Sequence, residues 1–91
     1  MSTDTADLPA TTTLETKNNV LHWKNEDFFI SVQEAQAVKR QVEKTMSRVD
    51  GILVDNSEAG GTWPTEIDEV WGGLMQNIYG EGVPCATVAA S

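Results

Sequence analysis

Four acidic side chains lie close together in the sequence, at the end of an apolar run, in the polar segment that follows it and at the start of the next helical pattern. The run is Gly51 to Asp55, and a helical pattern begins after the polar segment. Carboxylate oxygens are hard ligands of the kind that Ca²⁺ and Mg²⁺ prefer. One hypothesis is therefore a metal-binding protein or a small metal-dependent enzyme. The acids that it would use are Asp55, the best-placed single acid, and Glu58, Glu66 and Asp68.

Other features of the same segment favour a non-enzymatic protein without metal or cofactor. The spacing of the acids is not that of an EF-hand, and acids in a first helical turn are ordinary partners of the helix dipole. Catalysis by paired carboxylates needs two acids in different environments, and no residue pairs convincingly with Asp55. A nucleotide-binding loop needs more glycines than Gly60 and Gly61 provide. Because Cys85 and His22 are the single cysteine and histidine, an intrachain disulfide and a cysteine-based metal site are excluded.

Two threonines flank the proline that precedes the helical pattern. Thr65 can cap the helix by accepting a hydrogen bond from the Asp68 N–H, and Pro64 biases the residue before it away from helix. Thr62 is the second candidate for the cap, with the proline then inside the first turn. A phosphate at a helix N-terminus is stabilised by the dipole, although here it would also face several acids. Thr62 and Thr65 are therefore either structural caps or phosphorylation sites.

The polar loop also contains one large aromatic residue, Trp63. An exposed tryptophan is a candidate anchor for a partner, whereas a tryptophan folded onto the core is a packing residue. The sequence leaves both alternatives open. The loop and the start of the following helix are together predicted to form the surface for a protein partner. The residues of this surface are Asp55, Asn56, Ser57, Glu58, Trp63 and Pro64.

Composition limits the classes of protein to which the chain can belong. Its 91 residues are enough for one small domain with a modest core. It carries 14 acidic and 6 basic residues, for a net charge of −8, which keeps a protein soluble and repels nucleic acid and anionic membranes. A basic protein partner, or a high-salt cytoplasm, is the sharper interpretation of this charge. No run of about 18 apolar residues and no signal peptide is present, so a cytoplasmic protein is expected.

Hydrophobic periodicity predicts six elements in the order β-β-α-β-α-β. The first two strands form a hairpin at Asn18 and Asn19, because asparagine tolerates positive φ. Ser31 and Glu34 form a capping box at the start of the first helix. A polar, acidic arm over residues 1–10 is expected to be disordered. The strands are predicted at residues 11–17, 20–24, 51–55 and 85–90, and the helices at 31–48 and 66–79.

These elements predict a single α/β domain over residues 11–91. Helices between apolar strands imply right-handed crossovers and parallel pairing, and hence a small mixed sheet packed with helices. The strand at 51–55 is almost wholly apolar, which is typical of a central strand covered on both faces. Gly72 and Gly73 interrupt the second helical pattern, so a bend or a close packing contact is expected there.

The order and pattern of the elements resemble the STAS superfamily, the anti-sigma-factor-antagonist fold, and especially its STAS-like members of unassigned role. The resemblance covers residues 12–91 and rests on NNVLHW, SVQEAQAVKRQVEKTM, GILVDNSEAGG, TWPTEIDEVWGGL and CATVAAS. It implies a regulatory domain that acts through protein contacts. In phosphoregulated members, a kinase partner phosphorylates a Ser or Thr at the start of the second helix, and Thr62 and Thr65 fall near that position. Here TWPT replaces the acidic-hydroxyl-glycine turn of those members.

The resemblance also raises the possibility of self-association. The family usually continues with a third helix, whereas this sequence stops at Ser91, after its last predicted strand. An apolar strand without that cover is expected to expose surface that favours a homo-oligomer. The leading hypothesis is a non-enzymatic regulatory domain that binds a protein partner, such as an anti-sigma kinase-like protein. A small metal-dependent enzyme and a self-associating structural protein are the alternatives.

Overall fold

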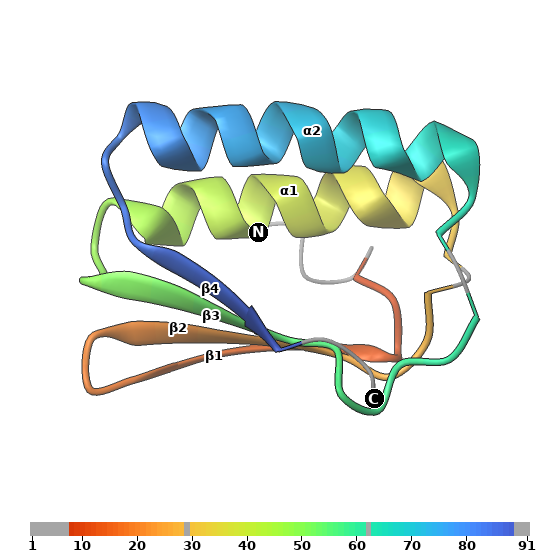
Figure 1. The fold of residues 1–91 in the computed structure, drawn as a ribbon, viewed down its shortest axis with the longest axis horizontal. Coiled ribbons are helices and arrows are strands. Elements are labelled where there is room, and N and C mark those ends of the chain that lie inside the picture. The colour runs from red at the N-terminus through yellow and green to blue at the C-terminus, as the bar shows by residue number, and fades with distance from the viewer. Residues whose placement is uncertain (1–7, 29, 62, 89–91) are drawn as a thin grey trace, which may run out of the picture.

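Six elements follow one another in the order that the sequence predicted. The computed structural model describes residues 8–28, 30–61 and 63–88. Figure 1 shows two layers, in which both helices lie over one face of a four-stranded sheet. The elements are β1 (Thr12–Lys17), β2 (Val20–Asn25), α1 (Val32–Met46), β3 (Gly51–Asp55), α2 (Thr65–Gly80) and β4 (Cys85–Val88).

The chain enters the sheet through a short segment that packs on the core. Leu8 contacts the main hydrophobic cluster, Pro9 is buried, and the Pro9 carbonyl accepts a hydrogen bond from the Thr12 N–H at 3.1 Å. The rest of the predicted arm, residues 1–7, lies outside the described residues. The last two residues of the strand predicted at 85–90 lie outside them as well.

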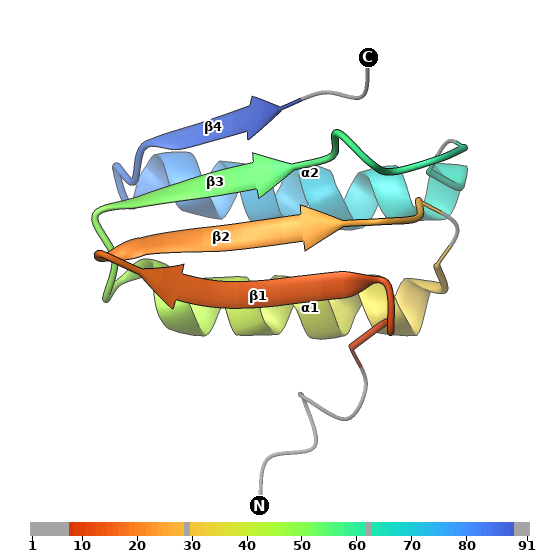
Figure 2. The same ribbon diagram turned by 90° about the horizontal axis from the view of Figure 1, so that it is seen from below.

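The sheet is mixed, as predicted, with the strand order β1-β2-β3-β4. Asn18 and Asn19 have φ values of 53° and 63°, which are those of a tight two-residue hairpin between antiparallel β1 and β2. β2, β3 and β4 run parallel, and a helix connects each strand to the next. Figure 2 shows the consequence: the carboxyl ends of these three strands meet at one edge of the sheet.

The core lies between the sheet and the two helices. Alternate residues of β2 and β3 point toward the helices, so that Leu21, Trp23, Ile52 and Val54 are almost fully buried. The helices contribute one apolar stripe each, at the spacing that the sequence predicted. The buried residues of these stripes are Ala35, Ala37, Val38, Val42 and Met46 from α1, and Ile67, Leu74 and Ile78 from α2.

The prediction that the strand at 51–55 is covered on both faces is wrong. Both helices lie on the same side of the sheet, because right-handed crossovers that advance in one direction place successive helices on one face. Leu53 therefore points to the side without helices, where it pairs in register with His22 of β2. His22 lies opposite Leu21 and Trp23, as the strand alternation predicted. We call this side of the sheet the uncovered face.

The two helices begin in different ways. α1 has the predicted capping box, in which the Ser31 hydroxyl accepts from the Glu34 N–H at 3.1 Å and Glu34 accepts from the Ser31 N–H at 2.9 Å. The prediction that Thr65 caps α2 is wrong. Pro64 is the N-cap residue, and no side chain among the described residues caps this end. Thr65 is already helical, so its hydroxyl is not in the position from which an N-cap side chain accepts.

α2 ends in a Schellman motif, which fixes the path into β4. The N–H of Gly82 donates to the Tyr79 carbonyl at 3.0 Å, and the N–H of Val83 donates to the Ile78 carbonyl at 3.2 Å. Gly82 has a φ of 72°, a conformation that residues with a Cβ rarely adopt. The helix runs without a break through Gly72, where a Cβ would meet no other atom within 4 Å.

Gly72→Ala and Gly82→Ala are therefore predicted to have opposite effects. Gly72→Ala is expected to raise the free energy of unfolding by about 0.5–1 kcal/mol, because alanine has the higher helix propensity and the site is open. Gly82→Ala is expected to lower it by about 1 kcal/mol or more, because the positive φ is strained for alanine. Urea unfolding of both variants measures this. A stabilising Gly82→Ala would contradict the described helix end.

Candidate functional site

Two loops lie side by side at the carboxyl ends of the parallel strands. Residues 26–31 follow β2 and residues 56–64 follow β3. Asp27 and Gly60 form an isolated parallel bridge, and the Phe28 N–H donates to the Gly60 carbonyl at 3.2 Å. We call these segments the paired loops. Ligand sites of α/β proteins commonly lie outside the carboxyl ends of their strands, so this edge is the first candidate for a functional site.

A buried asparagine joins the paired loops to the sheet. Asn25 is 1% exposed, and its Oδ1 accepts from the Thr12 hydroxyl at 3.2 Å and from the Trp23 indole N–H at 3.0 Å. Its Nδ2 donates to Oδ1 of Asn56 at 2.8 Å. One side chain thus connects β1, β2 and the loop that follows β3. Sequence analysis identified Asn56 but missed Asn25, although strict alternation from Leu21 and Trp23 would have placed it on the buried face.

Aromatic rings extend this network toward the second helix. Trp71 of α2 makes T-shaped contacts with Trp23 and Trp63, with ring centroids 5.2 Å apart in both pairs. Phe28 lies against Trp63 at 4.3 Å. Trp63 is half-buried and packs on the small cluster formed by Ile30, Ala35 and Ile67. The two alternatives for Trp63 were an exposed anchor and a ring packed on the core. Much of the ring is packed, and the remaining part is accessible to solvent.

A groove of about 280 Å³ opens beside these rings, between α2 and the ends of the strands. The Nε1 of Trp71 is buried without a hydrogen-bond acceptor among the described residues. Its T-shaped neighbours offer aromatic faces, which are weak acceptors for an N–H. We call this site the tryptophan groove. It is lined by Trp23, Asn25, Val54, Asn56, Trp63, Asp68, Trp71, Met75 and Thr87, with no basic side chain among them.

The other polar residues of the predicted partner surface have hydrogen-bond or ion-pair partners near the uncovered face. Asp55 accepts from the Ser57 hydroxyl at 2.6 Å and from the Ser57 N–H at 2.9 Å, and these bonds hold the pKa of Asp55 below its ordinary value. Glu58 forms an ion pair with Lys24 and raises the pKa of that ammonium. The loop thus presents an ordered set of polar groups whose carboxylates already have partners.

The four acids of the metal hypothesis are not brought together. Asp55 and Glu58 have the partners just described, whereas Asp68 lies on the rim of the tryptophan groove. Glu66 lines a different hollow, between the two helices. Within residues 8–28, 30–61 and 63–88, no three acidic, histidine or cysteine side chains are grouped so that they could hold a metal ion.

The two predicted phosphorylation sites differ in what the structure describes. Thr65 is exposed and is the first residue of α2, directly after half-buried Pro64. It lies next to the paired loops, where a protein partner could reach its hydroxyl. Thr62 lies outside the described residues.

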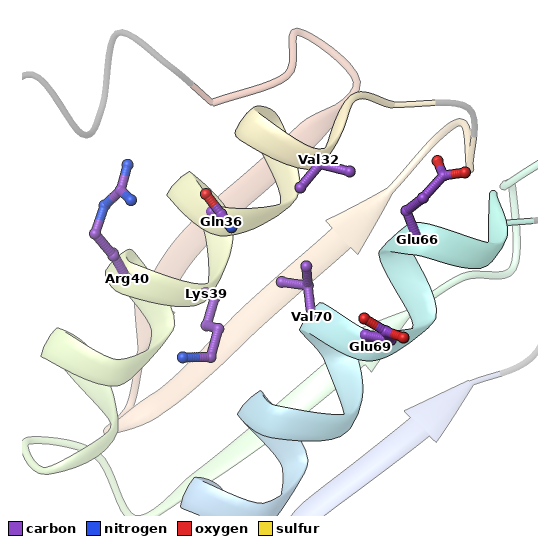
Figure 3. Close-up of a pocket in the computed structure, with 7 residues that line it drawn as sticks. All are labelled: Val32, Gln36, Lys39, Arg40, Glu66, Glu69 and Val70. Atoms are coloured by element: carbon purple, nitrogen blue, oxygen red, sulfur yellow. The ribbon is translucent and has the colours of Figure 1, made fainter.

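A second hollow, of about 490 Å³, lies between the outer sides of α1 and α2. Figure 3 shows Val32 and Val70 between the two helices, basic residues on α1 and acidic residues on α2. Lys39 is already paired with Glu43 of the same helix at 3.2 Å. This hollow is a charged surface between packed helices, without the aromatic walls of the tryptophan groove.

Comparisons with other proteins add no family to this description. The sequence matches no protein-family model, and it matches none of the curated proteins with which it was compared. The STAS resemblance therefore stays a prediction based on element order and pattern. None of the helices in the described part of the chain is both long and apolar enough to cross a membrane.

Asn25→Ala is predicted to destabilise the protein strongly. It would leave the Thr12 hydroxyl, the Trp23 indole N–H and the side-chain Oδ1 of Asn56 without their buried partner, at a cost of about 2–4 kcal/mol in the free energy of unfolding. Asn77→Ala is the matched control, because its amide bonds to Glu43 at an exposed position. Its expected cost is about 1 kcal/mol or less. Equal costs in urea unfolding would show that the Asn25 network is not central to stability.

Proposed function

We propose that this chain is a non-enzymatic regulatory domain that binds a protein partner at the paired loops and the start of α2. The observation that carries the proposal is that hydrogen bonds hold these loops in a fixed conformation. The Asn25–Asn56 hydrogen bond, the Asp27–Gly60 bridge and the Asp55–Ser57 bonds fix a polar surface before any partner arrives. A preordered surface loses less conformational entropy on binding.

Charge indicates the class of partner. The chain has a net charge of −8, and Glu66, Asp68 and Glu69 add acids at the start of α2, beside the paired loops. A basic surface on the partner would be attracted to this region, which would raise the association rate and favour one orientation. An anti-sigma kinase-like protein is the partner that the STAS resemblance suggests.

Thr65 is the described residue best placed to regulate such binding. Its hydroxyl is exposed at the positive end of the α2 dipole, next to the proposed surface. A phosphate there adds about 1.5 to 2 negative charges and three strong acceptor oxygens. Since the neighbouring side chains are already acidic, phosphorylation would change the charge that the partner meets. Thr62, three residues earlier in the sequence, is the second candidate.

Site-directed photo-crosslinking tests this proposal. A photoreactive side chain at Glu58 is expected to capture a discrete protein in cells, whereas one at Gln76, an exposed position far along α2, is expected to capture none. Thr65→Glu should change the yield at position 58 several-fold, and Thr65→Ser should not, because only the first adds charge. Capture at both positions, or at neither, would contradict a partner site at the paired loops.

Self-association through β4 is the second candidate function. Among the described strands, β4 has a neighbour on one side only. The Pro84 carbonyl accepts from the Ile52 N–H of β3, and the Val88 carbonyl accepts from the N–H of Asn56, the residue after β3. Because backbone groups alternate in direction along a strand of a parallel pair, the N–H and C=O of Cys85 and Thr87 point to the free edge. This edge carries no charged side chain. Charged residues are a common protection of edges against pairing, so a second copy could pair there.

Thr87→Pro is predicted to abolish such pairing while leaving the β3–β4 pairing in place. The substitution removes one outward N–H, and proline is tolerated at such positions of edge strands. Thr87→Ser keeps the N–H and is the control. Sedimentation equilibrium should show a dimer for the native chain and for Thr87→Ser, and a monomer for Thr87→Pro. A native chain that stays monomeric at high concentration would refute this second function.

A further inference from the structure

The tryptophan groove has the chemistry of a small-ligand site, independently of the proposed protein partner. Its walls come from β2, β3, β4, α2 and the loop after β3, so it depends on the complete fold. The accessible part of Trp63, the ring of Trp71 and the side chain of Met75 give it a largely apolar lining. Asp68, which is exposed, stands at its rim.

The indoles meet at steep angles, and they therefore form corners. The ring planes of Trp23 and Trp71 are inclined by 64°, and those of Trp63 and Trp71 by 68°. A group held in such a corner can contact more than one aromatic ring. The face of an indole carries the strongest negative potential of the aromatic side chains, and it attracts cations within about 6 Å of the ring centroid.

The charge of the groove also favours a cation. The Asp68 carboxylate makes no hydrogen bond or ion pair with any other described residue, in contrast to the carboxylates of Asp55 and Glu58. No lysine, arginine or histidine lines the groove in the described part of the chain. The Asn25 amide at the floor is already bonded to its neighbours. An anion in the groove would thus be repelled by the Asp68 carboxylate, with no basic side chain to offset the repulsion. A cation would be attracted by the same carboxylate, which is the one charged group among the described lining residues.

From these features we propose that the tryptophan groove binds a small alkylated ammonium ion. The methyl groups would lie against Trp63, Trp71 and Met75, with the positive charge near the Asp68 carboxylate. A volume of about 280 Å³ suits a compact ion of this kind. It is near the lower end of the range for ligand pockets, about 300–1,000 Å³, and is too small for a nucleotide or a lipid.

Choline and its neutral isostere, 3,3-dimethyl-1-butanol, test the proposal, because they share a shape and differ in charge. The reporters are the indole N–H signals of ¹⁵N-labelled native protein. Choline is expected to shift the Trp63 and Trp71 signals in a saturable way, and to bind at least about 5-fold more tightly than the isostere. No saturable shift with choline, or equal affinity for the two compounds, would overturn the proposal.

Asp68→Asn separates the carboxylate from the shape of the groove. It should weaken choline binding about 5-fold and leave binding of the isostere unchanged. Glu69→Gln is the matched control, because Glu69 is the next residue and lines the other hollow. It should leave both affinities unchanged. Equal effects of the two substitutions would show that only the net charge matters. Crosslinking at position 58 does not depend on choline binding. The proposal of a protein partner and the proposal of an ammonium ligand can therefore fail independently of each other.

Discussion

One buried amide determines how the paired loops are attached to the carboxyl ends of the strands. Asn25 sits in the core at the end of β2, where an unpaired amide would be costly. It is satisfied because β1 supplies the Thr12 hydroxyl, β2 supplies the Trp23 indole N–H, and the loop after β3 supplies the side-chain Oδ1 of Asn56. Those three segments must therefore hold fixed relative positions. The paired loops and the tryptophan groove both depend on this arrangement.

The two β-α-β crossovers determine where the other surfaces of the sheet lie. In the described part of the chain, both helices lie on one side of the sheet, no element covers the other side, and β4 is the last strand of the sheet. The carboxyl ends of the three parallel strands are then the place where loops, a helix start and aromatic side chains meet. The proposed partner site and the proposed cation site both lie at these carboxyl ends, because the topology brings the same loops and helix start together there. They use different groups, because Asp55 and Glu58 have partners and Asp68 has none among the described residues.

Much of the fold could be predicted from the sequence, because local patterns determine it. Apolar alternation, the pair Asn18–Asn19 and the Ser31 capping box are local signals, and each predicted its element correctly. The bounds of β3 were predicted as observed. Coverage of β3 could not be predicted from its apolar run, because it depends on the direction in which both crossovers advance. The start of α2 was predicted one residue late, since Pro64 and Thr65 are both acceptable beside a helix start.

The candidate site was predictable only in part. Its position after β3 followed from the strand–loop–helix pattern, and Asn56, Trp63 and Asp68 were all identified. Their grouping was not, because it requires Trp23, Trp71 and Thr87 from distant segments to meet. The metal hypothesis treated proximity in sequence as proximity in space. In the fold, a strand end and a helix turn direct Asp55 and Asp68 to different surfaces.

Asn25 is expected to hold the paired loops as one preordered unit. Amide hydrogen exchange of the native protein and of Asn25→Ala tests it most directly. Phe28 and Ala59 donate N–H groups within these loops, and their protection should fall together by about tenfold or more relative to Val42 in α1. Unchanged protection at both amides, or loss at one loop alone, would contradict the claim.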